Sequence, residues 1–468
     1  MTKFKDKIVL ITGGTSEIIK LQREFFLGNK TKSVKFRLEQ LKRFRHILKE
    51  NEALLYDAIY ADFGKSVFET YETELVLIYH EINQAIKKVK QWSKPKKVRT
   101  NLANFPGKSR IYSEPFGNTL VVGAWNYPYQ LTLVPVVSAI AAGNTVVIKP
   151  SELASHTSAI MAKLINENFP KDFLYVQEGG VSETTDLLNQ KFDKIFFTGS
   201  TRVGRIVYEA AAKNLTPVTL ELGGKSPSFV FPDADLKMTA KRIAWGKFLN
   251  AGQTCVAPDY VLVHSDVKDR FLEELKNQIL QIQGEDPKGC ESYVRIINKQ
   301  NFDRLSELID PDKIYFGGET SVEYLHINPT VLQNVTFNDK VMEEEIFGPI
   351  LPIIEFNDLE EIITDVKRRP KPLALYVFTK KESIKRKILN EVSFGGGCVN
   401  DTIMHLSNPK LPFGGVGSSG MGNYHGKMGF DCFSHKKSVL HKGIWFEPFL
   451  KYKPYTNLNK KILKWIVE

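Results

Sequence analysis

The feature that most constrains the fold is a stretch, residues 115–148, that contains no charged side chain. It is long enough to cross a bilayer. Polar residues and prolines interrupt it, however, and two glycines mark turns: Asn126, Pro128, Gln130, Pro135, Asn144, Gly123 and Gly143. The pattern therefore predicts a strand, loop, helix, turn and strand buried in a protein core rather than a transmembrane segment.

The segments that follow extend this pattern into an α/β fold. Apolar strand-like runs at 119–122, 144–149 and 194–198 each adjoin a helical segment, and a second alternating run covers about residues 226–399. Such alternation is typical of parallel sheets, so we predict two α/β lobes. Residues 18–92 have helical apolar spacing. Residues 94–113 break it, as a linker or a protruding hairpin would.

Composition narrows the functional class. The chain is 42% hydrophobic and 25% charged, as ordinary globular proteins are, and its net charge of +11 is spread over helical segments. We expect no nucleic-acid partner, because no basic stripe interleaved with aromatic residues is present. Four scattered cysteines predict no disulfide framework and no metal site. No signal peptide is visible, so we expect a cytoplasmic protein.

The N-terminus resembles another enzyme family superficially. Residues 7–16 look like the first strand and glycine turn of a short-chain dehydrogenase, but Glu17 and Ile19 stand where two further glycines would follow. A glutamate there would repel a bound pyrophosphate. The family's Tyr-x-x-x-Lys pair occurs only at Tyr376 and Lys380, inside an apolar strand-like run. We therefore interpret residues 1–16 as an additional strand or arm.

Cys255 is the candidate nucleophile. It lies between a helical run and a strand-like run, with Gly-Gln-Thr before it and Val-Ala-Pro after it, and reactive groups are commonly presented on such loops. A lone cysteine is more often a small buried apolar residue. The local sequence leaves both interpretations open.

Other stretches place polar groups at the ends of predicted strands. Asn126 and Lys149 each follow a strand, and residues 197–204 read as strand, glycine turn and helix start, which offers backbone N–H groups to a phosphate. Glu221 and the glutamates at 344–345 lie beside glycine turns. Each of these features alone is also compatible with an ordinary structural role.

Together, seven stretches resemble the aldehyde dehydrogenase superfamily in content and order. They are Trp-Asn-Tyr-Pro (125–128), Lys-Pro-Ser-Glu (149–152), Thr-Gly-Ser-Thr (198–201), Glu-Leu-Gly-Gly-Lys (221–225), Gly-Gln-Thr-Cys (252–255), Glu-Glu-Ile-Phe-Gly-Pro (344–349) and Leu-Pro-Phe-Gly-Gly (411–415). Residues 253–260, 371–376 and 420–426 are similar to class 3, the fatty and aromatic aldehyde dehydrogenases. The resemblance covers about residues 18–440.

The resemblance implies roles for these residues. Cys255 would attack the aldehyde carbonyl, the Asn126 amide would stabilise the oxyanion, and Glu221 would act as the general base that hydrolyses the thioester. NAD or NADP would bind through Lys149, Glu152, Thr198, Gly199, Ser200, Gly204, Glu345 and Phe347. Trp245 would line the substrate funnel.

Residues outside the motifs are expected to be structural. Arg202 occupies a variable position of the phosphate turn, and we expect it to face solvent. His425 is expected near a subunit contact rather than in acid–base chemistry. Cys290, Cys398 and Cys432 are interpreted as structural cysteines.

The resemblance also implies a domain organisation. Residues 17–92 and 114–221 would form the Rossmann-like cofactor domain, and residues 222–428 the catalytic domain. Residues 93–113 and 429–441 would form the oligomerisation segment of a homodimer, with an arm at 1–16 and a tail at 442–468. Some class 3 relatives end in a membrane-anchoring helix, whereas this tail lacks a comparable apolar run.

Three alternative functions remain open from the sequence. An acylating enzyme or acyl reductase would use the same cysteine but pass the acyl group to another thiol. A short-chain dehydrogenase acting from residues 12–16 would not need Cys255. A non-catalytic protein would bind the cofactor without turnover. The predicted function is NAD(P)-dependent oxidation of a hydrophobic aldehyde to its carboxylic acid.

Overall fold

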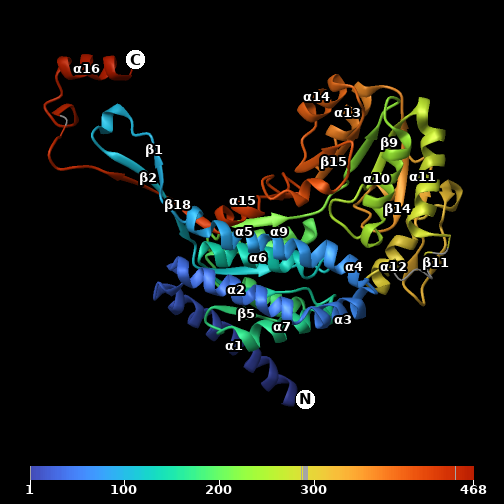
Figure 1. Cartoon of the computed structure of the whole chain (residues 1–468), viewed down its shortest axis with the longest axis horizontal. Coiled ribbons are helices and arrows are strands. Elements are labelled where there is room, and N and C mark those ends of the chain that lie inside the picture. The colour runs from blue at the N-terminus through green and yellow to red at the C-terminus, as the bar shows by residue number, and fades with distance from the viewer. Residues whose placement is uncertain (1, 286, 288–292, 448, 468) are drawn as a thin grey trace.

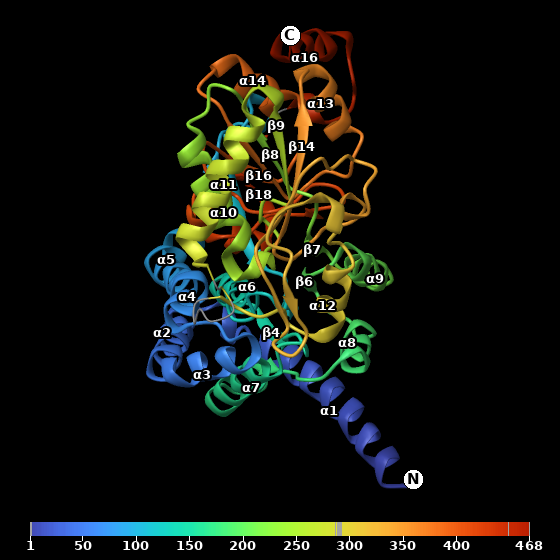
Figure 2. The same ribbon diagram turned by 90° about the vertical axis from the view of Figure 1, so that its right-hand side faces the viewer.

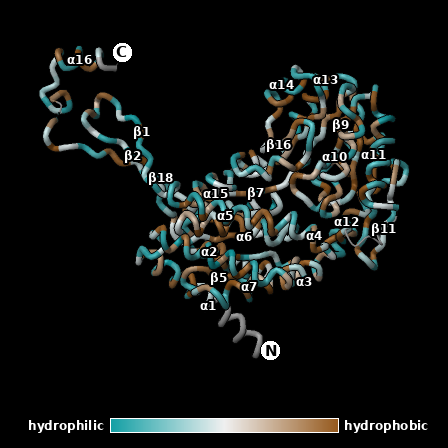
Figure 3. Tube along the Cα trace, in the orientation of Figure 1, coloured by the Kyte–Doolittle hydropathy of each residue, from teal (hydrophilic) through white to brown (hydrophobic). Residues whose placement is uncertain are grey.

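The computed structural model describes residues 2–285, 287, 293–447 and 449–467. Its described strands form a six-stranded sheet, a seven-stranded sheet, a three-stranded antiparallel sheet and a two-stranded sheet. The predicted α/β class is confirmed. The two large sheets lie one above the other in Figure 2, and apolar residues run through the interior of both in Figure 3.

The first large sheet carries most of the predicted site residues. Its strand order is β17 (Gly420–Met421), β7 (Val218–Glu221), β6 (Lys194–Thr198), β3 (Asn118–Val122), β4 (Thr145–Lys149) and β5 (Leu174–Val176). All neighbouring strands are parallel except β17. The carboxyl ends of β3, β4, β6 and β7 therefore share one edge, where ligands bind in sheets of this kind.

Helices cover this sheet. They are α1 (Thr2–Leu27), α2 (Val34–Glu50), α3 (Glu52–Phe63), α4 (Val67–Thr70), α5 (Val76–Trp92), α6 (Gln130–Ala142), α7 (Ser155–Asn168), α8 (Val181–Leu188) and α9 (Thr201–Ala212). Every residue of α6 is buried. A helix that is apolar on all sides belongs in a core, which explains the uncharged stretch 115–148.

The second large sheet is also mainly parallel. Its order is β10 (Ile314–Phe316), β13 (Thr330–Leu332), β14 (Ile350–Phe356), β9 (Tyr260–His264), β8 (Pro227–Val230), β15 (Ala374–Phe378) and β16 (Gly396–Val399). The nearby helices are α10 (Leu236–Phe248), α11 (Lys268–Gln283), α12 (Lys299–Ser306), α13 (Leu359–Lys367) and α14 (Glu382–Glu391). The predicted domain boundaries remain a prediction.

A hairpin projects from the body of the molecule in Figure 1. Strands β1 (Lys96–Val98) and β2 (Lys108–Pro115) pair antiparallel, and β2 pairs along its whole length with β18 (Ser434–His441), which follows α15 (Gly426–Cys432). Residues 94–113 are thus a hairpin and not a linker. The chain ends in α16 (Asn457–Val467). No helix among the described residues is both long and apolar enough to cross a membrane.

Of the two forms predicted for residues 1–16, the strand is wrong, and the arm stays a prediction. Helix α1 runs from Thr2 to Leu27 without a break. A strand at 7–11 would need a free sheet edge to pair its backbone, whereas a helix satisfies its backbone N–H and C=O groups within the segment. The dinucleotide turn of a short-chain dehydrogenase does not form. Tyr376 lies buried in β15, where its hydroxyl donates to the Val256 carbonyl at 2.5 Å.

Helix α1 is joined to the first sheet by Gln22. Its buried amide donates to the Val146 carbonyl (3.1 Å) and the Lys171 carbonyl (3.0 Å), and it accepts from Asn118 Nδ2 (2.8 Å). We predict that Gln22→Ala lowers stability by about 1–3 kcal/mol, because it leaves buried polar groups without partners. Urea unfolding followed by fluorescence measures this as a lower midpoint.

The exposed Glu24 on the same helix provides the control. Glu24→Ala is expected to change stability by less than about 0.5 kcal/mol. Equal midpoints for the two variants would contradict the anchoring role of Gln22.

Candidate active site

A tight turn places Cys255. After α10 ends, Asn250, Ala251 and Gly252 all have left-handed backbone, with φ of 54°, 50° and 72°. The buried Gln253 side chain fixes this turn: its amide donates to the Asn250 carbonyl (3.1 Å) and the Arg295 carbonyl (3.2 Å), and its oxygen accepts from the Ile297 N–H (3.0 Å). The loop with Cys255 then leads into β9.

The thiol of Cys255 lies in an acidic environment. Its side chain is half-buried. Burial and, to a smaller extent, the charges of Glu345 and Glu221 together raise the pKa of Cys255 to about 12. The thiol is therefore protonated at neutral pH in the free protein, and its use as a nucleophile requires a base or a cation nearby.

Asn126 joins the first sheet to the Cys255 loop. It is buried in the loop after β3, and its amide donates to the Gln253 carbonyl at 3.1 Å. Its own carbonyl accepts from Asn250 Nδ2 at 2.9 Å. The structure thus brings the side-chain amide predicted to stabilise an oxyanion next to the backbone that precedes Cys255.

Glu221 ends β7 and carries a carboxylate without a partner. The residue is only 3% exposed, and neither carboxylate oxygen has a hydrogen-bond partner in the described part of the chain. Burial holds the pKa of Glu221 well above its usual value. An unpaired buried carboxylate is costly, so it indicates a group whose partner arrives with the substrate.

The Gly-Gly pair of the Glu-Leu-Gly-Gly-Lys motif makes room for Glu345. A Cβ on Gly223 would collide with the Glu345 carboxylate, and Gly224 has a φ of +153° and donates its N–H to that carboxylate. Burial and the charge of Asp259 raise the pKa of Glu345 to about 8. The two motifs, far apart in sequence, therefore form one contact.

A buried ion pair holds the loop that contains Glu345. Lys225 Nζ donates to Asp259 (2.5 Å) and to the carbonyls of Val341 (3.0 Å) and Glu344 (2.8 Å). The other Asp259 oxygen accepts from the Ile346 N–H at 3.0 Å. Neither residue was predicted to have a role, although both lie within motif stretches beside turns.

Aromatic side chains line the same region. The Phe347 ring meets Trp125 edge-on at 5.2 Å between centroids, and Trp125 stacks on Phe63 at 6.4 Å. Phe347 has a φ of 54°, which is unusual for a bulky residue. Trp245 on α10 is half-buried against the main hydrophobic core, and its place in a substrate funnel remains a prediction.

The predicted cofactor residues meet at the carboxyl edge of the first sheet. Val122 pairs with Lys149 and with Phe197, and Thr198 pairs with Glu221. Lys149 is buried, which lowers its pKa, and its Nζ donates to the Pro150 carbonyl (2.7 Å) and lies 3.9 Å from the exposed Glu152.

The turn after β6 leads into α9. Thr198 Oγ1 is buried without a partner in the described residues, and the Ser200 hydroxyl caps α9 by accepting from the Val203 N–H at 3.4 Å. Gly199 lies so close to the Phe197 ring, and Gly204 to Leu222, that a Cβ on either would require movement. The helix N-terminus, the unpartnered hydroxyl and the buried lysine fit the phosphates and ribose of a dinucleotide. The predicted solvent position of Arg202 is confirmed.

The remaining candidates have local contacts of their own. His425 is buried between Phe413 and Tyr424, and burial lowers its pKa to about 4. Cys398 Sγ lies 3.6 Å from His405 Nδ1, and Cys432 Sγ lies 3.1 Å from Thr219 Oγ1. Cys290 lies outside the described residues. Within the described residues no group of metal-ligating side chains forms a site.

Known proteins share this sequence and architecture. The sequence model of the aldehyde dehydrogenase family matches residues 15–439. The chain is 47% identical over 442 residues to the 4,4'-diaponeurosporen-aldehyde dehydrogenase of Staphylococcus aureus, covering 94% of this chain and 96% of that protein. It is 46% identical over 429 residues to the dimeric NADP-preferring aldehyde dehydrogenase of Rattus norvegicus, covering 92% and 95%. The substrate-bound Staphylococcus aureus AldH structure matches with a TM-score of 0.95 and 45% identity, covering 97% of this chain and 99% of that one.

The raised pKa of Cys255 predicts slow alkylation of the ligand-free protein. With a pKa of about 12, only about one thiol in ten thousand is ionised at pH 8, against about a quarter of free cysteine. We expect the iodoacetamide rate at Cys255 to rise about tenfold per pH unit up to pH 10. Peptide mass spectrometry at successive pH values measures the rate.

The same alkylation rate is measured in a Glu345→Gln variant. Above pH 8 the Glu345 carboxylate is ionised and opposes the thiolate, so Glu345→Gln is expected to alkylate faster at pH 9, whereas the exposed neighbour Glu343→Gln is not. A rate that levels off below pH 9, or equal rates in both variants, would contradict the electrostatic account.

Proposed function

The chain belongs to the aldehyde dehydrogenase family, whose members oxidise aldehydes with NAD(P), and we propose that its substrate is a hydrophobic aliphatic or aromatic aldehyde, converted to the carboxylic acid. The observation that supports this most strongly is the arrangement of Cys255, Asn126 and Glu221. The Asn126 amide donates to the Gln253 carbonyl, two residues before Cys255. The Glu221 carboxylate, which has no hydrogen-bond partner among the described residues, raises the pKa of the Cys255 thiol.

The first step is attack on the carbonyl. Cys255 Sγ bonds to the aldehyde carbon while the carbonyl π electrons move to the oxygen and the thiol proton passes to water, which gives a tetrahedral thiohemiacetal with an electron-rich oxygen. The Asn126 amide and the Cys255 backbone N–H donate to that oxygen. The carbon–hydrogen bond can then break with its electron pair, which a planar aldehyde does not allow.

When bound, oxidised nicotinamide would supply the acceptor for this hydride, and a thioester would remain on Cys255. Lys149, Glu152, Thr198, Gly199, Ser200 and Gly204 would hold the adenosine and phosphate portion. Glu345 would bind the nicotinamide ribose, and Phe347 would pack against the ring.

Hydrolysis completes the reaction. Glu221 takes a proton from water, the resulting hydroxide attacks the thioester carbon, and the carbon–sulfur bond breaks to give the acid and a free thiol. The buried position of Glu221 favours this role, because a raised pKa makes the carboxylate a better base. The unpartnered carboxylate favours hydrolysis over transfer of the acyl group to another thiol.

The apolar character of the substrate is inferred from two observations. Phe63, Trp125 and Phe347 form an aromatic cluster next to the Asn126 loop. The Staphylococcus aureus relative is named for 4,4'-diaponeurosporen-aldehyde.

We also propose a homodimer in the cytoplasm. The sheet of β1, β2 and β18 leaves strand edges for pairing, and the rat relative is named as dimeric. Three free cysteines among the described residues agree with a reducing compartment. Residues 17–92 with 114–221 would bind the cofactor, residues 222–428 would carry the nucleophile, and residues 93–113 with 429–441 would form the subunit contact.

Replacement of Glu221 separates the two chemical steps. We predict that Glu221→Gln gives one rapid equivalent of NAD(P)H per active site and then turnover reduced by about 10²–10⁴-fold, because the base for hydrolysis is missing. Stopped-flow absorbance at 340 nm with a panel of short, long and aromatic aldehydes measures both phases. Steady turnover at the wild-type rate would contradict the assignment.

Replacement of Asn126 tests the oxyanion donor. Asn126→Ala is expected to lower turnover by about 10²–10³-fold without a burst, because the loss falls on the first step. Cys255→Ala should abolish turnover, and Cys398→Ala, which removes another half-buried thiol, is the matched control. Formation of free acid without any added thiol distinguishes hydrolysis from acyl transfer.

A further inference from the structure

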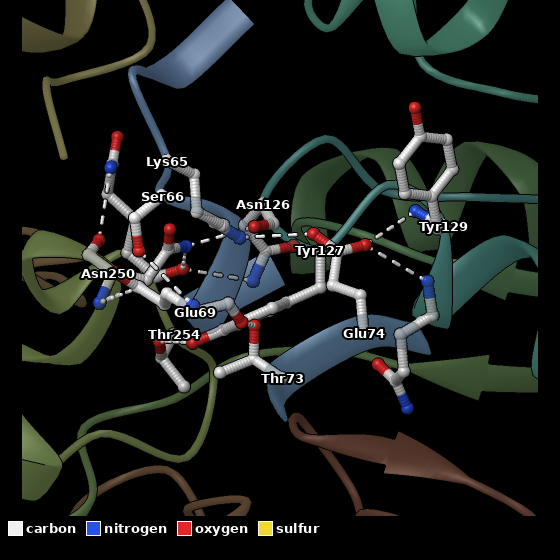
Figure 4. A network of polar contacts seen from close by, with 12 residues as sticks. Lys65, Ser66, Glu69, Thr73, Glu74, Asn126, Tyr127, Tyr129, Asn250 and Thr254 are labelled. Carbon is white, nitrogen blue, oxygen red and sulfur yellow. Dashed lines mark hydrogen bonds and ion pairs between the residues drawn. The ribbon is translucent and has the colours of Figure 1, made fainter. Parts of the chain in front are cut away.

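Three buried charged residues next to the site have no role in the mechanism above. Lys65, in the loop before α4, is 1% exposed, and Glu69 and Glu74, in the helical segment that follows, are 9% and 0% exposed. Figure 4 shows them between the Asn126 loop and the Cys255 turn. Burying a charge is costly unless the charge is paired, so each needs an explanation.

A π-helical turn determines which face of the segment carries Glu69 and Glu74. Residues five apart in an α-helix differ by about 140° around the axis. Between Glu69 and Glu74, however, α4 continues into a π-helical turn, Tyr71–Leu75. Its wider winding brings residues five apart onto a common face, and such turns are frequent at functional sites.

Glu74 ties this segment to the start of α6. Its carboxylate accepts from Lys65 Nζ (3.0 Å) and from the backbone N–H groups of Tyr129 (2.8 Å) and Gln130 (3.2 Å). These bonds fix the end of the Trp-Asn-Tyr-Pro loop that contains Asn126.

Lys65 contacts the same loop through the aromatic ring of Tyr127. Its ammonium lies 4.5 Å from the centroid of the Tyr127 ring. The Tyr127 hydroxyl lies 2.6 Å from Thr254 Oγ1, and Thr254 is the neighbour of Cys255. The cation therefore reaches the nucleophile loop through one aromatic side chain.

Glu69 reaches the turn that precedes the nucleophile. Its carboxylate accepts from the Asn250 N–H at 3.2 Å. The Asn250 side chain in turn donates to the carbonyls of Asn126 (2.9 Å) and Gln253 (3.1 Å).

We propose that Lys65, Glu69 and Glu74 are positioning residues for aldehyde oxidation, which together set the placement of the Asn126 amide relative to Cys255. The inference rests on the proposed roles of those two residues. Ionic contacts fix the orientation of each loop more closely than apolar contacts would, because charge-assisted hydrogen bonds are short and strongly oriented.

The test is the neutral exchange Lys65→Met with Glu74→Gln. It removes one positive and one negative charge and keeps the side-chain shapes, and neutral replacement of a buried pair commonly preserves stability. We expect a melting temperature close to wild type, an unchanged KM for NAD(P), and a kcat at least about tenfold lower, because small misplacements of reacting groups are expensive. The exposed pair Lys299 and Asp303 (2.6 Å), changed to Met and Asn, is the control.

A double-mutant cycle distinguishes positioning from general packing. If Lys65 acts through the ring, the same exchange in a Tyr127→Leu background should lower kcat by less than about threefold, because coupled residues are not additive. An undiminished loss in that background, or a wild-type kcat for the exchange, would overturn the proposal. Turnover retained by Cys255→Ala would instead refute the proposed function itself.

Glu69→Gln decides the question if the exchange does not fold. It keeps the size of the side chain and weakens only the bond to Asn250. A lower kcat at an unchanged melting temperature supports the proposal, and an unchanged kcat overturns it.

Discussion

The site depends on a turn whose backbone conformation is energetically unfavourable. Three consecutive left-handed residues precede the Cys255 loop, and for Asn250 and Ala251 this conformation costs roughly 1–2 kcal/mol each. Hydrogen bonds from the Asn250 and Gln253 side chains offset the cost, and Gly252 fits against the Gly348 backbone where a Cβ would collide. One strained turn thereby brings the Asn126 loop, the Cys255 loop and the Glu345 loop together.

The electrostatics of the site follow from this closeness. Glu221, Glu345 and the thiol of Cys255 are near one another, and burial raises the pKa of all three. Such an arrangement favours a cation, and oxidised nicotinamide carries one. Burial keeps the free thiol protonated, and the same burial gives the carboxylate at Glu221 the basicity that the proposed hydrolysis requires. In the proposed mechanism, protection of the thiol and activation of water thus have one physical cause.

Much of this site could be predicted from the sequence, because parallel strands bring their carboxyl ends to one edge. Lys149, Thr198 and Glu221 each end a strand and Asn126 follows one, and that regularity is visible in a linear pattern. The helical form of residues 2–17 was missed because an apolar run beside two glycines also suits a strand. The Lys65–Glu74 pair was missed because a π-helical turn changes which residues share a face. The Lys225–Asp259 pair was missed because the two residues, and the backbone groups near Glu345 that they bind, lie far apart in the chain.

In the proposed reaction the substrate is held covalently by one sulfur atom. Mass spectrometry can detect this bond when Glu221→Gln is incubated with NAD(P) and an isotopically labelled aldehyde, quenched in acid and digested. We expect an acyl adduct on the peptide that contains Cys255, at close to one per chain. An adduct on another residue, or none while NAD(P)H is formed, would contradict the proposed reaction.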